Sequence, residues 1–63
     1  MVGTRVQIPA WTDEWMMGDR YGEVKRVVVA SHLDTNEWRV KVKLDKSGKT
    51  INFWVNDLTI IGG

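Results

Sequence analysis

The chain has 63 residues, a net charge of +1, four tryptophans, one histidine and no cysteine. A chain this short forms a single domain, residues 1–63, and buries only about 60% of the surface that its unfolded form exposes. Disulfides are excluded and a zinc site is not expected, so stability must come from aromatic packing or self-association. We expect no metal and no cofactor.

The order of residues adds information about location and charge. No apolar run is long enough to span a membrane, and the start lacks the charged and then apolar pattern of a signal peptide. We therefore expect a cytoplasmic protein without a membrane partner. Acidic residues predominate in residues 10–24 and basic residues in residues 39–49, so we predict a dipolar molecule.

The first strand is predicted over residues 4–8, where apolar and polar side chains alternate up to Pro9. A long loop follows. The second strand is predicted over residues 22–31, which are rich in valine, but its alternation breaks at two successive charges, Lys25 and Arg26. A β-bulge at this point keeps three apolar side chains on one face, namely Val24, Val27 and Val29.

A turn over residues 32–36 precedes the clearest strand, residues 37–44. Its even-numbered side chains face the core, and these are Trp38, Val40, Val42 and Leu44. Residues 45–48 form a tight turn in which Gly48 can adopt a positive φ. The fourth strand, residues 49–55, then turns its odd-numbered apolar side chains inward: Ile51, Phe53 and Val55.

The parity of these two strands restricts how they pair. A two-residue or a four-residue loop brings both apolar faces together, whereas a three-residue loop does not. In the allowed registers Trp54 lies outward, opposite Arg39 or Lys41, where a cation–π contact is expected. A helical turn over residues 56–58 and a last strand over residues 59–61 complete the chain. We predict no α-helix and a small closed or nearly closed all-β barrel.

This order of elements resembles an SH3-like barrel, with a long loop after strand one, three consecutive strands, and a 3₁₀ turn and closing strand at WVNDLTII. The stretch GDRYGEV, residues 18–24, resembles the GxxGxV core of KOW-type modules, which are SH3-like barrels of transcription and ribosomal proteins, in its two glycines and following valine. The segments IPAWTDEWMMGDRYGEV and LDKSGKT are similar to short uncharacterised bacteriophage and prophage proteins. The resemblance implies a five-stranded SH3-like barrel.

The residues of peptide-binding SH3 domains are not present. There is no ALYDY stretch, Trp38 falls on the core-facing parity, and VNDL stands where Pro-x-x-Tyr is expected. The sequence therefore argues against recognition of proline-rich peptides in the usual SH3 groove.

The outward positions of the third and fourth strands form the leading candidate site. Cations there can meet phosphates while an indole offers a stacking surface, so we predict nucleic-acid binding. The site residues are Arg39, Lys41, Lys43, Trp54 and Asn52. Lys46, Lys49 and Arg5 are candidates to extend the site. The ordinary alternative is that lysine and arginine keep these strands soluble and guard sheet edges.

The loop over residues 10–22 supports a different function, a protein-interaction module such as a phage-encoded modulator of a host protein. Its predicted binding residues are Trp11, Asp13, Glu14 and Tyr21, and nearby methionines suit an apolar partner. Alternatively, the loop caps the core with Trp15 and one methionine, and Asp13, Glu14 and Asp19 are solvated or pair with Arg20 and Arg26. A mixed outcome buries Trp15 and Met16 and leaves Trp11 and Tyr21 partly exposed.

Other chemistries are not indicated. Although Gly48 opens a GKT triplet, the spacing to an earlier glycine that a phosphate loop requires is missing, and Gly18 and Gly22 are expected to serve backbone geometry. His32 lies alone in a predicted turn, which does not suit zinc. So small a barrel has no interior pocket for catalysis. We expect a non-enzymatic module, monomeric or weakly dimeric, whose partner is nucleic acid or a host or partner protein. The third alternative is a protein with no ligand site beyond self-association.

Overall fold

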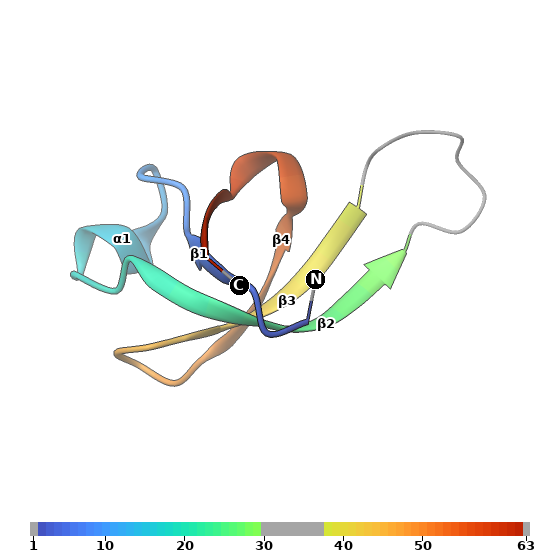
Figure 1. The fold of residues 1–63 in the computed structure, drawn as a ribbon. Coiled ribbons are helices and arrows are strands. Elements are labelled where there is room, and N and C mark those ends of the chain that lie inside the picture. Colours follow the sequence, from blue (N-terminus) through green and yellow to red (C-terminus); the bar gives the residue numbers. More distant parts are fainter. Residues whose placement is uncertain (1, 30–37, 63) are drawn as a thin grey trace.

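A computed structural model describes residues 2–29 and 38–62 (Figure 1). The predicted turn over residues 32–36, with His32, lies outside these residues. The elements in chain order are β1 (Arg5–Gln7), α1 (Asp13–Met16), β2 (Tyr21–Val29), β3 (Trp38–Leu44), β4 (Thr50–Trp54), η1 (Val55–Asp57) and β5 (Thr59–Gly62). The all-β class, the long loop after β1 and the 3₁₀ turn before the last strand are confirmed.

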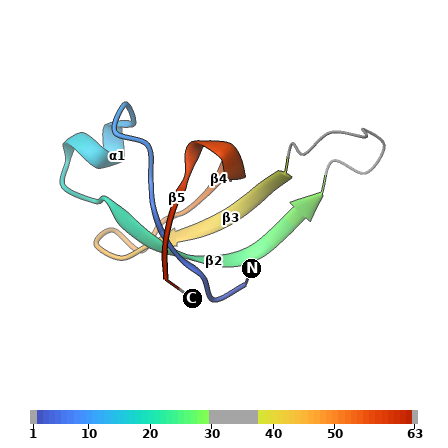
Figure 2. The same cartoon turned by 45° about the horizontal axis from the view of Figure 1, so that its top comes forward.

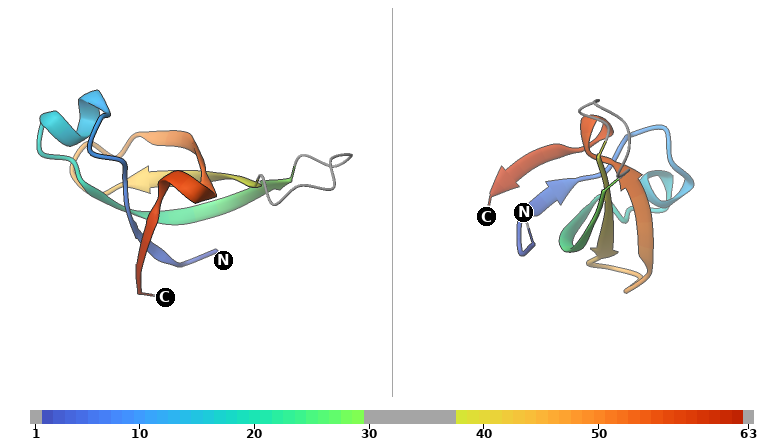
Figure 3. Two further views of the ribbon diagram at one scale, coloured as in Figure 1. Left: turned by 90° about the horizontal axis from the view of Figure 1, so that it is seen from above. Right: turned by 90° about the vertical axis from the view of Figure 1, so that its right-hand side faces the viewer.

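The strands form one antiparallel sheet in the order β4-β3-β2-β1-β5. In the described part of the chain β4 and β5 do not pair, so the predicted barrel is not closed. Figure 3 shows the sheet curling with these two strands at its opposite edges. The short turn η1 carries the chain from one edge toward the other without closing the ladder. Membership of the SH3-like superfamily stays a prediction.

The β2–β3 ladder contains the predicted bulge. Val24 pairs with Val42 and Arg26 with Lys41, so that the register shifts across Lys25. The shift keeps Val24 buried and lets Val27 pack against the core. Gly22 allows the two strands to approach, because a Cβ at this position would lie 2.7 Å from the carbonyl oxygen of Lys43. The expectation that Gly22 serves backbone geometry is confirmed.

The β3–β4 hairpin has the four-residue loop that parity allowed. Val42 pairs with Ile51 and Val40 with Phe53, and the Leu44 N–H donates to the Lys49 carbonyl at 2.8 Å. Gly48 has a φ of +74°, as predicted for the tight turn. The register therefore places the outward side chains of β3 and β4 beside each other.

The core lies on one face of the sheet and consists of seven buried side chains: Val6, Ile8, Val24, Val40, Val42, Leu44 and Phe53. Trp15, Val27, Ile51, Val55 and Leu58 pack against them. Trp38 lies on the core-facing parity of β3, as predicted, but it is not buried, since it is 44% exposed. β4 ends at Trp54, opposite Arg39, so no residue of β4 lies opposite Trp38 to cover it.

The helix α1 was not predicted, and it forms because Thr12 caps its first turn. The Thr12 hydroxyl donates to the Pro9 carbonyl at 2.8 Å and accepts from the Trp15 N–H at 3.2 Å. Trp15 packs against the core as expected, but the predicted burial of Met16 is wrong, since Met16 is 73% exposed. A single helical turn directs only one side toward the core, and Trp15 occupies that side.

α1 and the turn between β3 and β4 lie at the same end of the molecule (Figures 1 and 2). The β2–β3 hairpin runs away from that end. Across residues 2–29 and 38–62, the helices are too short or too polar to cross a membrane.

Candidate functional site

The predicted nucleic-acid site lies on the outer face of the sheet, which is turned away from the core. Directly opposite residues of a ladder project to the same face, so the strand registers define rows across β2, β3 and β4. Three rows matter here, and they are Val28–Arg39–Trp54, Arg26–Lys41–Asn52 and Glu23–Lys43–Thr50. The structure thus brings the five predicted site residues together on one surface.

Arg26 joins this surface, although the sequence reasoning did not include it. The bulge at Lys25 turns Arg26 outward, directly opposite Lys41. The outward position of Arg26 could have been derived from the predicted bulge. A bulge at Lys25 that keeps Val24 and Val27 on the core face also turns Arg26 to the outer face. The basic face is defined by six residues: Arg26, Arg39, Lys41, Lys43, Asn52 and Trp54.

Arg39 and Trp54 form the aromatic end of the basic face. The guanidinium carbon of Arg39 lies 4.3 Å from the centroid of the Trp54 ring, which is a cation–π contact. The Trp54 side chain is still 37% exposed. The pair therefore presents a fixed cation and accessible indole surface next to each other.

Among the described residues, the four cations of the basic face take part in no salt bridge. The two salt bridges found there join Arg5 to Asp45 and Lys25 to Glu23, the latter at 3.0 Å. Glu23, the acid in the third row, is thus already paired with Lys25. Because like charges placed directly opposite are unfavourable, Arg26 and Lys41 raise the positive potential of the basic face at a cost in stability.

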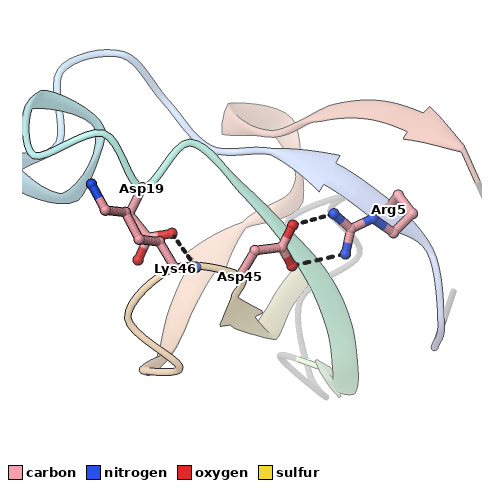
Figure 4. A network of polar contacts seen from close by, with 4 residues as sticks. All are labelled: Arg5, Asp19, Asp45 and Lys46. Carbon is pink, nitrogen blue, oxygen red and sulfur yellow. Dashed lines mark hydrogen bonds and ion pairs between the residues drawn. The ribbon is translucent and has the colours of Figure 1, made fainter.

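The three residues predicted to extend the site either contact other groups or lie on the other face of the sheet. Arg5 is on the outer face, in register with Glu23, but its guanidinium makes two hydrogen bonds to the Asp45 carboxylate (Figure 4). The Lys46 ammonium donates to the Met17 carbonyl at 3.2 Å. Lys49 pairs with Leu44, on the core-facing parity. Arg5 and Lys46 are thus engaged in other contacts, and the extension of the site to these three residues stays a prediction.

Asp19 has a structural role that the sequence did not reveal. Its buried carboxylate accepts a hydrogen bond from the N–H group of Lys46 at 3.0 Å (Figure 4). It accepts a second from the N–H group of Ser47 at 2.9 Å. Burial raises the pKa of Asp19, but the hydrogen bonds from Ser47 and Lys46 outweigh it and hold the pKa below its usual value. Asp19 thus ties the long loop to the β3–β4 turn, in place of the expected pairing with Arg20 or Arg26.

Arg20 stacks on a tryptophan instead, with its guanidinium carbon 4.7 Å from the centroid of Trp15. The Arg5–Asp45 contact is the other polar link at this end of the sheet. The hydrogen bonds from Arg5 hold the pKa of Asp45 below its usual value despite partial desolvation. Asp19 and Asp45 are therefore both engaged in structural contacts.

The residues predicted for protein binding do not form one surface. Trp11 is 70% exposed and Met17 is 74% exposed on the loop that carries α1, and Asp13 and Glu14 lie in the first turn of that helix. Tyr21 instead belongs to β2, where it pairs with Gln7 on the outer face of the sheet. We call Trp11, Met16 and Met17 the apolar loop surface.

Two open hollows adjoin the β3–β4 turn. One has a volume of about 310 Å³ and is lined by Glu14, Met17, Asp19, Lys46, Ser47 and Lys49. The other, of about 470 Å³, continues from Lys43 between Glu23, Lys25 and the turn. In residues 2–29 and 38–62 no three His, Cys, Asp or Glu side chains come together as a metal site would require.

No protein-family model, curated protein or solved structure matches the chain.

Proposed function

We propose that the protein is a non-catalytic binding module, on a small SH3-like fold, that associates with nucleic acid through the basic face. The observation that carries this proposal is the row in which Arg26 lies directly opposite Lys41, with Arg39 and Lys43 before and after Lys41 on β3. Repulsion within this group weakens the sheet. A polyanion that binds across this row relieves the repulsion between Arg26 and Lys41, so the like-charge pair favours binding of a polyanion.

Each residue type has a distinct role in the proposed complex. The four cations meet phosphate oxygens, and the arginines can do so with two parallel N–H groups. The exposed part of Trp54 offers a π-face for a base. Asn52, in the row of Lys41, can donate to or accept from a base edge or a sugar. Most of these contacts are independent of base sequence, so we expect little sequence preference.

Retention on a DNA or heparin column at low salt tests the proposal. The wild type is retained and elutes early as salt rises, because phosphate contacts release counterions. Arg39→Glu combined with Lys41→Glu abolishes retention. The matched control is a pair of single variants, Lys41→Glu and Lys49→Glu, which change the net charge equally at different places. Retention that is absent in the wild type, or lost equally in both single variants, contradicts the proposal.

A second candidate function has its own observation, the apolar loop surface. A small domain needs its large apolar side chains inside, yet Trp11, Met16 and Met17 are all more than two-thirds exposed. The scaffold beneath them is fixed by the Thr12 cap and the Asp19 carboxylate. Exposed aromatic and methionine side chains on a fixed support are typical of surfaces that bind other proteins.

Reconstitution separates this second function from the first. A protein partner captured from a host extract is identified, purified and titrated against the wild type. The interaction is weakened by Trp11→Ala and unaffected by Lys41→Glu if the apolar loop surface is the binding site. The reverse pattern assigns the partner to the basic face, and unaltered affinity in both variants contradicts a role for either surface in protein binding.

A further inference from the structure

The arrangement of cations and indole on the basic face distinguishes between classes of nucleic acid. Arg39, Lys41 and Lys43 lie at alternate positions of one strand, β3. Same-face neighbours on a strand are about 7 Å apart, so these three cations form a line about 14 Å long. A single line of charge matches one sugar-phosphate backbone.

The position of Trp54 adds a second, independent constraint. It lies in the same row as Arg39, on the adjacent strand β4, and adjacent strands are about 4.8 Å apart. A backbone that follows β3 therefore has the indole directly at its side. In a duplex the bases at that side are stacked and paired, whereas the bases of a single strand are free to stack on an aromatic ring.

The Arg39–Trp54 contact prepares this stacking position. The guanidinium lies 4.3 Å from the ring centroid, so both planar groups are held in place before a ligand arrives. A base can stack on the remaining indole surface while its phosphate meets Arg39 or Lys41. Arg26 belongs to the neighbouring row, with Lys41 and Asn52, and lies on β2, on the other side of β3 from Trp54. That row contains no aromatic residue.

From this geometry we infer that the ligand of the basic face is a short stretch of single-stranded nucleic acid, which runs along β3 with one base stacked on Trp54. This inference rests on the proposed function and names its ligand class. A 14 Å line corresponds to about four phosphate intervals in a stacked strand and to fewer in an extended one. The binding site is therefore filled by about five nucleotides or fewer.

Fluorescence anisotropy with labelled oligonucleotides at low salt tests the inference. The probes are a single strand of about 15 nucleotides, the duplex of the same sequence, and shorter single strands. We expect the single strand to bind at least about tenfold tighter than the duplex, with affinity per site no longer rising beyond about five nucleotides. Trp54→Leu should remove the preference for the single strand, and Trp54→Phe should keep it.

Trp38→Ala is the matched control, because Trp38 is also exposed but lies on the opposite parity of β3. It should leave the preference unchanged, and chemical unfolding verifies that each variant is folded. Equal or tighter binding of the duplex overturns the inference while the proposed function stands. A preference that Trp54→Leu retains also overturns it. Absence of binding to both probes overturns the inference and the proposed function together.

Discussion

Asp19 shows at the scale of a single residue how the loop that carries α1 is fixed. A buried carboxylate that accepts two backbone N–H groups stabilises the ionised form. Its pKa in the folded protein lies below the usual value, so the folded state binds fewer protons than the unfolded chain, whose aspartates have a pKa of about 3.9. The stabilisation is complete above that pH and is lost as the pH falls through the folded-state pKa.

Asp19→Asn tests this role. At pH 7 the variant should be less stable than the wild type by about 1–3 kcal/mol, because the amide accepts poorly from two convergent N–H groups. Urea unfolding at pH 7 and near pH 3 measures both the loss and its pH dependence. The wild type should lose stability on acidification and the variant should lose less, with Asp45 responsible for part of what remains. Equal stability of the two proteins at pH 7 would contradict the role.

At the scale of elements, β2 and β3 contribute core residues and all four cations of the proposed site, and β4 adds Asn52 and Trp54. The same cross-strand register that buries Val24 and Val42 places Arg26 opposite Lys41, and Glu23 opposite Lys43. The two outward pairs therefore have opposite electrostatic signs. The contribution of each pair to stability can therefore be tested with two substitutions on β3 that change the net charge by the same amount.

Lys41→Glu should stabilise the protein by about 0.2–1 kcal/mol, because it converts a like-charge pair with Arg26 into an opposite-charge pair. Lys43→Glu should destabilise it by a similar amount, because it places two acids opposite each other. Urea unfolding at low salt measures both effects. Both variants should bind nucleic acid more weakly than the wild type. A Lys41→Glu protein that is less stable than the wild type would show that Arg26 and Lys41 do not repel.

The strands were predictable because alternation with a period of two is local. The apolar faces of β3 and β4 meet through Val40, Val42 and Phe53. This pairing restricts the length of the loop between the strands and places Arg39 next to Trp54. The exposure of Trp38 was not predictable, since it depends on where the partner strand ends. The same holds for Met16, whose exposure depends on the side that a single helical turn presents.

Contacts between distant segments were the least predictable part of the candidate site. Asp19 accepts from N–H groups 27 and 28 residues away, and Arg5 contacts Asp45 across 40 residues. No periodic pattern in the sequence indicates such partners. These contacts give Arg5 and Lys46 partners that the sequence did not indicate. Arg26, by contrast, joins the basic face through the bulge, a local feature that the sequence did show.

At the scale of the whole molecule, three of the acids differ in their contacts from the four cations of the basic face. Asp19, Glu23 and Asp45 are held in hydrogen bonds or ion pairs with neighbouring groups. The four cations of the basic face take part in neither of the salt bridges between described residues. A net charge of only +1 thus coexists with a surface of concentrated positive charge, the surface that we propose binds nucleic acid.

The salt dependence of single-strand binding tests most directly whether the four cations of the basic face contact phosphates. With four cations at phosphates, the logarithm of the affinity should fall with the logarithm of the salt concentration with a slope of about −3. Lys41→Gln should make the slope shallower by about 0.7, and Lys49→Gln should leave it unchanged. A slope near zero, or an equal change in both variants, would contradict binding through the basic face.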